Sequence, residues 1–415
     1  MSGGCAVSWG GGELARGWRG RSGGTGPSGR VGGSLSTARA AVVSASRNSL
    51  AIDADGFVHS WGFNDSRGGG DRWHTTATRA IDDSGQLGRG GRKTPEIVQR
   101  AGRALAIASG RYHALAVAAA DRSVVSWGLN DHGQLGRAGW ISGSGSAGER
   151  RCREGARCRD GLPRSAFALR SPQLPPVAAV AAGRDFSVAV TESGRVFAWG
   201  RCACGRAGAD AAAPPIVSSR PYEVRGGGVE AAEVAQASAG YAHLLLRTRS
   251  GAVFSCESGD DGYGGRLRPA PPPNAHGQLG RGGPPREPRR VEWTAAAAAP
   301  AVRAVAAGRC ASFATDGAAT TWGWGCAQAN GAADGADARA PAPIAGLAGL
   351  AVRALAAGEY HALALLDDGR VLTWGTGAGA RLPVRALELG GVATAVAAGY
   401  QHSLAIVNAS GGCSG

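Results

Sequence analysis

A short apolar segment ending in Trp-Gly recurs along the whole chain, and this repeat constrains the fold more than any other feature of the sequence. Six copies contain the tryptophan, at Trp9, Trp61, Trp127, Trp199, Trp322 and Trp374. A seventh copy, VFSCES, has Cys256 in the tryptophan position. Successive anchors lie 52, 66, 72, 57, 66 and 52 residues apart, so one unit is repeated with loops of different length.

A second repeated segment contains a glycine followed three residues later by a histidine, as in VRALAAGEYHALAL from Val352. Four copies have the histidine, at His113, His243, His361 and His402, and three have Asn48, Phe186 or Ala311 instead. Short apolar runs bracketed by glycine favour strands. Each unit is therefore predicted to be strand, glycine turn, strand, Asp-Gly or Ser-Gly turn, and a strand ending in Trp-Gly.

The two ends of the chain are incomplete units that complement each other. The Trp9 segment has no partner before it, and the last unit, ending near Ile406, has no Trp-Gly strand after it. We expect residues 5–10 to supply the missing strand of the last blade, because closure removes exposed sheet edges. The predicted fold is all-β, a seven-bladed β-propeller closed by the N-terminal strand.

Irregular Gly/Arg/Pro-rich inserts are predicted to interrupt the repeats. They lie at about 17–39, 67–82, 138–172, 209–230, 260–273 and 283–300. The same repeat continues on both sides of each insert, so residues 1–415 are expected to form a single propeller domain.

The segments that follow several Trp-Gly anchors contain Gly-Gln-Leu-Gly, as in NDHGQLGRAG from Asn130 and NAHGQLGRGG from Asn274. Together with Gly-x-x-His and Trp-Gly, this pattern resembles the regulator of chromosome condensation repeat. The resemblance implies a seven-bladed propeller with N-terminal strand closure. It also implies several functions: nucleotide exchange on a Ran-type small GTPase with chromatin attachment, UV-B photoreception, β-lactamase inhibition, or a protein-interaction module.

Among these functions we expect a protein-interaction module that binds a protein partner, with guanine-nucleotide exchange on a Ran-like small GTPase as its specific form. In the exchange factor a catalytically important aspartate lies in Gly-x-Asp-His, and Asp185 has that place here, although Phe186 follows it. No other catalytic residue is indicated, so a non-catalytic binding protein is expected. We also expect a monomer.

Two alternatives remain open at this point. Chromatin or RNA attachment would use arginine-rich inserts such as residues 148–164. A UV-B receptor would need tryptophans in Gly-Trp-Arg-His-Thr motifs, and Trp73, in an insert, is the one residue that resembles such a motif.

The charge and cysteine content say little about partners. The net charge is +14, but Lys93 is the one lysine among 45 basic residues, a usage typical of GC-rich coding sequence. Nucleic acid is therefore a weak candidate partner. Nine cysteines without regular spacing or a Cys-x-x-Cys pair predict neither a disulfide framework nor a zinc site, and indicate a reducing compartment.

The four histidines recur at one repeat position and should be dispersed around the ring, where they cannot converge on a metal. A repeated hydrogen bond to neighbouring backbone is the expected role. No phosphate-binding loop has the required context, so no cofactor is expected. The start of the chain lacks a signal peptide and no apolar run is long enough to cross a membrane, so we expect a cytoplasmic or nuclear location and no membrane partner.

Overall fold

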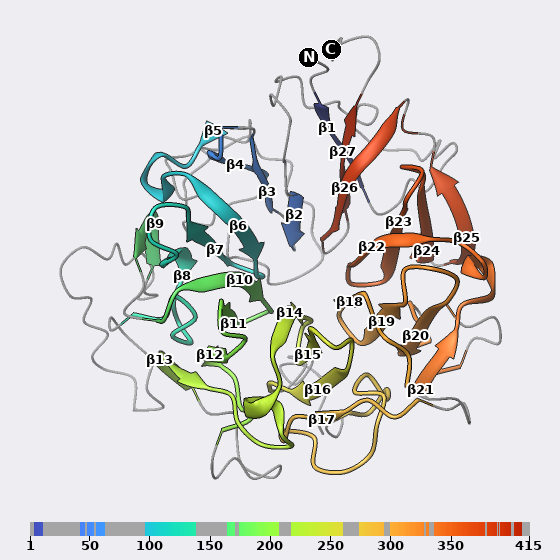
Figure 1. The fold of residues 1–415 in the computed structure, drawn as a ribbon. Coiled ribbons are helices and arrows are strands. Elements are labelled where there is room, and N and C mark those ends of the chain that lie inside the picture. Colours follow the sequence, from blue (N-terminus) through green and yellow to red (C-terminus); the bar gives the residue numbers. More distant parts are fainter. Residues whose placement is uncertain are drawn as a thin grey trace.

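The computed structural model describes residues 4–10, 42–45, 48–53, 55–62, 96–137, 164–170, 174–206, 217–259, 274–293, 299–327, 329–331, 336–377, 380–387, 389, 391–399 and 402–408. Within these residues the strands form antiparallel sheets that radiate from a central axis, like the sectors of a wheel (Figure 1).

Five sheets are full blades, with four strands each and with side chains described on each of the three inner strands. The first three are β6 (Ala104–Ser109), β7 (His113–Ala118), β8 (Val124–Leu129) and β9 (Arg164–Arg170); β10 (Val177–Ala182), β11 (Phe186–Thr191), β12 (Val196–Arg201) and β13 (Val217–Glu223); and β14 (Val234–Ala239), β15 (His243–Thr248), β16 (Val253–Glu257) and β17 (Arg289–Arg290). The other two are β18 (Ala304–Ala307), β19 (Ala311–Thr315), β20 (Thr321–Gly325) and β21 (Ala338–Pro343); and β22 (Val352–Ala357), β23 (His361–Leu366), β24 (Val371–Gly377) and β25 (Ala380–Leu387).

Two further sheets lie where the ends of the chain meet, and they differ from the full blades. One contains β2 (Val42–Ala45), β3 (Asn48–Ile52), β4 (Val58–Gly62) and β5 (Glu96–Ile97). The other has three strands in its described part, β1 (Gly4–Gly10), β27 (His402–Asn408) and β26 (Val392–Ala398). Only the backbone of β1 and β2 is described.

The prediction of a seven-bladed propeller of like units is therefore corrected to five full blades and two unequal sheets. The repeat count gives the number of sequence units, but it does not establish that every unit becomes an equivalent blade. The first unit has a degraded second segment, VVSASRNSLAI, and the last has three strands in its described part. The backbone of β1 does pair with β27, with Ala6 opposite Ile406 and Trp9 opposite Ser403.

The inserts are also partly corrected, because several contain the outermost strand of a blade. The insert predicted at 138–172 contains β9, the one at 209–230 contains β13, and the one at 283–300 contains β17. Proline occurs in one of these three outer strands, at Pro221 in β13. An edge strand tolerates proline because its outward N–H groups need no partner in the sheet. The inserts at 17–39, 67–82 and 260–273 lie outside the described residues.

The predicted hairpin turns are confirmed. The glycines of the five Asp-Gly and Ser-Gly pairs all have φ between +77° and +88°, a conformation that glycine adopts without strain. These glycines are Gly56, Gly194, Gly251, Gly317 and Gly369.

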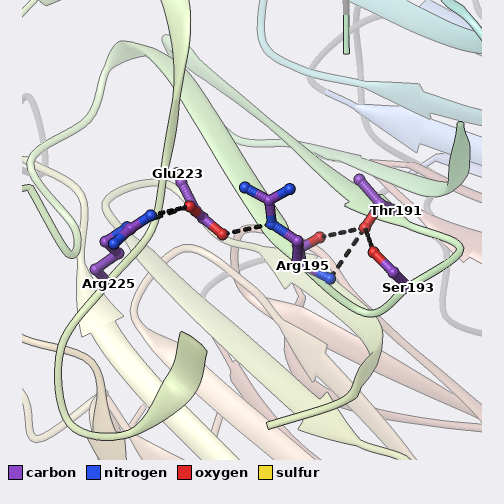
Figure 2. A network of polar contacts seen from close by, with 5 residues as sticks. All are labelled: Thr191, Ser193, Arg195, Glu223 and Arg225. Atoms are coloured by element: carbon purple, nitrogen blue, oxygen red, sulfur yellow. Dashed lines mark hydrogen bonds and ion pairs between the residues drawn. The ribbon is translucent and has the colours of Figure 1, made fainter. Parts of the chain in front are cut away.

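Around the β11–β12 turn, polar contacts join the hairpin to the outer strand (Figure 2). The Thr191 Oγ1 lies 2.9 Å from the Ser193 hydroxyl and accepts a hydrogen bond from the backbone N–H of Arg195. Glu223, at the end of β13, accepts hydrogen bonds from Arg195 and Arg225, at 2.6 Å each. The bond from Arg195 lowers the pKa of Glu223 to about 2. These hydrogen bonds connect the end of the outer strand β13 to the β11–β12 hairpin.

The core consists of small residues near the axis and large ones between blades. Ala114, Ala189 and Ala364 on the second strands are fully buried. Among the large side chains, Trp199 and Phe313 are 0% and 1% exposed. Large aromatic side chains fill the wider space between sheets, as expected for strands that diverge from an axis.

Two disulfides among the described residues correct the prediction that the cysteines form no disulfide framework. Cys204 is bonded to Cys256 on the next blade, and Cys310 is bonded to Cys326 within one blade. Cys202 is a buried free thiol, and burial raises its pKa to about 11. The pairs differ in sequence separation because the contact between two blades brings Cys204 and Cys256 together, whereas one hairpin brings Cys310 and Cys326 together.

Candidate functional site

All the Gly-x-x-His turns lie at the same end of the blades, because each joins the first strand to the second with the same antiparallel connection. We call this end the histidine-turn face. In the full blades it is formed by the turns 110–113, 183–186, 240–243, 308–311 and 358–361 and by the loops that follow the Trp-Gly strands. The network of Figure 2 lies at the opposite end of its blade.

The four predicted histidines are dispersed around the ring and do not converge. Each instead contacts a serine hydroxyl on the next blade. The distances from Nε2 to Oγ are 2.8 Å for His113 and Ser187, 2.9 Å for His243 and Ser312, 2.8 Å for His361 and Ser403, and 3.1 Å for His402 and Ser49. The expected bond to neighbouring backbone is thus corrected to a bond with a side chain.

A backbone carbonyl accepts the next hydrogen bond of the same network. The Ser187 hydroxyl donates to the carbonyl of Gln134, at 2.8 Å, and the Nε1 of Trp199 donates to that same carbonyl at 2.9 Å. Ser312 and Trp324 repeat this arrangement at Gln278. We call the contact between two neighbouring blades a seam. At each of these two seams the Gly-Gln-Leu-Gly loop therefore supplies one carbonyl that accepts both hydrogen bonds.

Blades without the histidine lack the serine on the next blade as well. After Phe186, Ala311 and Asn48, the facing position on the following blade is Leu244, Ala362 and Ala114. A histidine left without its partner would bury an unsatisfied polar group, which costs free energy. The pairs are thus matched seam by seam. Burial lowers the pKa of each of the four histidines to about 4, so the rings are neutral near pH 7.

The glycine of each turn leaves room for the ring three residues later. A Cβ on Gly110 would lie 2.2 Å from the Cε1 of His113, and one on Gly183 would lie 2.0 Å from the Cε1 of Phe186. The same space thus accepts an imidazole or a phenyl ring.

One predicted tryptophan anchor is in the wrong register. Trp324, not Trp322, lies opposite Ser312, as Trp199 lies opposite Ser187. Trp324 is fully buried, whereas Trp322 is partly exposed and packs against Trp293. A shift of two residues keeps the same face of a strand, so the sequence pattern of TTWGWG did not separate the two.

The other anchors lie at the expected strand position. Trp127, Trp199 and Trp374 are at most 1% exposed and Trp61 is 6% exposed. The side chain of Trp9 lies outside the described residues, as does Trp73, the residue that resembles the UV-B motif.

A cavity of about 80 Å³ lies on the axis, at the histidine-turn face. It is lined by the backbone of the glycine turns and by the residue that follows each glycine. These residues are Arg111, Arg184, Tyr241, Arg309 and Glu359. The glycine recurs at each of these positions, while the next residue is arginine in three blades, tyrosine in one and glutamate in one.

The charges around the cavity are unequally compensated. Arg309 forms an ion pair with buried Glu359 and lies between the rings of Tyr241 and Tyr360, at 5.6 and 5.3 Å from the centroids. The Nε of Arg184 lies 3.3 Å from the carboxylate of Asp185. Arg111 stacks on Tyr112 at 4.8 Å, and no carboxylate among the described residues forms an ion pair with it.

Asp185 lies at this face, next to the cavity, and is 9% exposed. Its neighbourhood includes His132, whose Nδ1 lies 3.0 Å from the carboxylate of Asp131. Burial acts to lower the pKa of His132, but the bond to Asp131 and the charge of Asp185 raise it above its ordinary value. Asp185 therefore belongs to a cluster of mixed charge beside the axis.

Sequence reasoning missed Arg111, Arg309 and Glu359 as candidates. The signal that could have found them is their position directly after the turn glycine of their blades, where the residue type varies from arginine to glutamate. In the described part of the chain, no three His, Cys, Asp or Glu side chains are grouped to hold a metal ion. None of the helices in that part is long and apolar enough to span a bilayer.

Comparison with known proteins places this architecture in context. Residues 80–413 match the family model described as the RCC1-like domain. Over 328 residues the chain is 28% identical to the probable E3 ubiquitin-protein ligase HERC6 of Homo sapiens. The match covers 74% of this chain but 28% of that relative, so the chain spans a minor part of the longer protein.

Two solved structures share the fold over nearly the whole chain. Human WBSCR16 superposes with a TM-score of 0.69 at 19% identity, covering 98% of this chain and 99% of that one. Prp20p of Saccharomyces cerevisiae, reported with its binding properties to Gsp1p and histones, superposes with a TM-score of 0.65 at 16% identity, covering 99% and 93%. At these identities the likeness concerns the fold.

Proposed function

This chain belongs to the RCC1-like domain family, and from that premise we propose that it acts as a non-catalytic protein-binding module whose histidine-turn face receives the partner. The observation that carries the proposal is the residue after each turn glycine. The turn glycine recurs in all five full blades and makes room for a buried ring in four of them, whereas the next residue varies: Arg111, Arg184 and Arg309 are arginines, and Tyr241 and Glu359 are not. Charged and aromatic side chains that packing does not require are typical of binding surfaces.

The test is affinity capture from cells that express the protein. Wild-type chain and an Arg111→Ala/Arg184→Ala variant are immobilised, and the retained proteins are identified. We expect at least one partner to be retained by the wild type and lost from the variant. Arg195→Ala, on the opposite face (Figure 2), is the matched control and should retain the same partner. Equal retention by all three proteins would contradict a partner at the histidine-turn face.

Guanine-nucleotide exchange on a Ran-like small GTPase is the more specific form of this proposal. It is supported by the position of Asp185, which the family resemblance associates with exchange and which lies on the same face as the cavity. An exchange factor acts by stabilising the nucleotide-free GTPase, so no chemical step is needed from the propeller. Release of fluorescently labelled GDP from a Ran-type GTPase should accelerate in the presence of this chain and slow with Asp185→Asn.

The exchange form and the general binding form give different results. A chain that captures a partner without accelerating GDP release is a binding module alone. Attachment to chromatin or RNA through residues 148–164 concerns a segment of which only Arg164, the first residue of β9, is described. It predicts binding that weakens steeply with salt.

A further inference from the structure

We propose that the axial cavity binds a single carboxylate presented by an acidic segment of the partner protein. The inference rests on the proposed function, because it uses the same face. The inference adds to the proposed function a subsite and the chemical class of the group that binds there.

The first argument is the size and lining of the cavity. A space of about 80 Å³ accepts a small group but no folded element of a partner. Its wall is formed by the turn glycines, by the small residue before each glycine and by the residue after it, and turns from neighbouring blades approach closely. The carbonyls of Gly308 and Gly358 accept hydrogen bonds, at 3.2 Å, from the backbone N–H groups of Tyr241 and Arg309 on the preceding blade. The cavity is therefore held rigidly around the axis.

The second argument is charge. Of the three arginines that line the cavity, Arg309 forms an ion pair with Glu359 and Arg184 lies 3.3 Å from Asp185. Arg111 forms no ion pair with a described carboxylate, although the charge of Asp185 acts on it from beyond ion-pair distance. The guanidinium of Arg111 is held in place by its stacking on Tyr112. Arginine offers a planar pair of donors that matches a carboxylate, and stacking reduces the entropy lost when the bond forms.

The third argument distinguishes a carboxylate from a polyanion. Asp185 and Glu359 lie beside the same cavity, and Asp131 lies close to Asp185. A nucleic-acid backbone would bring several negative charges against these carboxylates, whereas one aspartate, glutamate or chain-terminal carboxylate meets Arg111 alone. Charge complementarity thus favours a protein segment with an isolated acidic group.

The test measures binding of short fluorescent peptides by anisotropy. The probes are an amidated glycine-serine peptide with one central glutamate, its glutamine counterpart, and the glutamine peptide with a free rather than amidated C-terminus. A single-stranded RNA of similar length is added as a fourth probe. We expect the glutamate peptide to bind at least about tenfold more tightly than the amidated glutamine peptide. Stronger binding of the free-terminus peptide would identify a chain-terminal carboxylate as the ligand.

The variants locate the site. Arg111→Ala should reduce the affinity for the glutamate peptide about tenfold or more, and Arg111→Lys, which keeps the charge but not the paired donors, should have a smaller effect. Arg195→Ala should leave the affinity unchanged. Equal binding of the glutamate and glutamine peptides, absence of binding by every peptide, insensitivity to Arg111→Ala, or tighter binding of the RNA would each overturn the inference.

Failure here is distinguishable from failure of the proposed function. The glutamate peptide is added in excess to the capture experiment. A partner that is lost from the Arg111→Ala/Arg184→Ala variant but is not displaced by the peptide would support the binding face while contradicting the carboxylate subsite.

Discussion

The β7/β11 and β11/β15 seams join the same blade to its two neighbours, but different kinds of side-chain contact stabilise them. At the β7/β11 seam His113 contacts Ser187, and Trp199 donates to the backbone of Gln134. At the β11/β15 seam Phe186 and Leu244 occupy the equivalent positions. Cys256 stands in the tryptophan position there, bonded to Cys204 with a Cα–Cα distance of 5.6 Å.

The difference shows that each seam is a matched set. Phe186, Leu244, Cys204 and Cys256 belong to one buried apolar cluster, so no polar atom of these side chains needs a partner. At the β7/β11 seam the His113 Nε2 and the Trp199 Nε1 both have hydrogen-bond partners on the neighbouring blade. A mixture of the two sets would bury an unpaired polar group, and this explains why the substitutions occur together.

Removing the tryptophan should have the largest effect at the β7/β11 seam. Trp199→Ala leaves a cavity between two blades and removes one of the two donors to the Gln134 carbonyl, and should lower the free energy of unfolding by about 3–5 kcal/mol. Urea unfolding followed by circular dichroism measures the change. Trp322→Ala is the control, because Trp322 is partly exposed and does not hold the anchor position. An equal loss in both variants would contradict the corrected register.

At the β11/β15 seam the Cys204–Cys256 disulfide should make the largest contribution to the free energy of unfolding. Cys204→Ala/Cys256→Ala should destabilise the fold by about 2–5 kcal/mol, because the bond restricts the unfolded chain. A dithiol reductant should lower the melting temperature of the wild type and have a smaller effect on this variant. Cys202→Ala should keep the full response to the reductant. A melting temperature unchanged by the double substitution would show that apolar packing alone holds this seam.

Acid should selectively destabilise the seams that contain a buried histidine. The histidines have a pKa of about 4 in the folded protein and an ordinary value of 6.5, so between these values the unfolded chain takes up protons that the folded chain does not. Stability is therefore full above pH 6.5 and falls as the pH drops toward 4, by up to about 3 kcal/mol for each buried histidine.

The variant His113→Phe/Ser187→Leu copies the apolar pair of the β11/β15 seam into the β7/β11 seam. Gly183 already accommodates the ring of Phe186, and Gly110 offers similar space. The variant should fold and should lose stability less steeply with acid than the wild type, as measured by thermal unfolding across this pH range. An unchanged pH slope would exclude His113 as a source of acid sensitivity.

The smallest expected effect is the coupling between His113 and Ser187 themselves. A double-mutant cycle with His113→Ala and Ser187→Ala should give a coupling free energy of about 1 kcal/mol, typical of one buried hydrogen bond. His113→Ala combined with Ser312→Ala, which belongs to another seam, should be additive. Equal coupling in both cycles would mean that the contact acts through the whole ring rather than through the seam.

The local rules were readable from the sequence where a residue's role depends on its own strand. The turn glycines such as Gly194, the buried position of Trp199 and the complementarity of the two chain ends all follow from period and turn chemistry. The outer strands were missed because a strand at the rim pairs on one side and carries no repeated signal, as VSSRPYE with its proline illustrates. The register of Trp324 was missed because two residues on one strand face are equivalent by periodicity.

By itself, the sequence determined that this chain is built from repeated β units whose glycines, histidines and tryptophans recur in order. Only the tertiary structure decided what lies across each seam: serine opposite histidine, cysteine opposite cysteine, and three arginines around one axial cavity. The physical reason is that such contacts join residues tens of positions apart, so they depend on how the sheets are arranged around the axis and not on any pattern within one repeat.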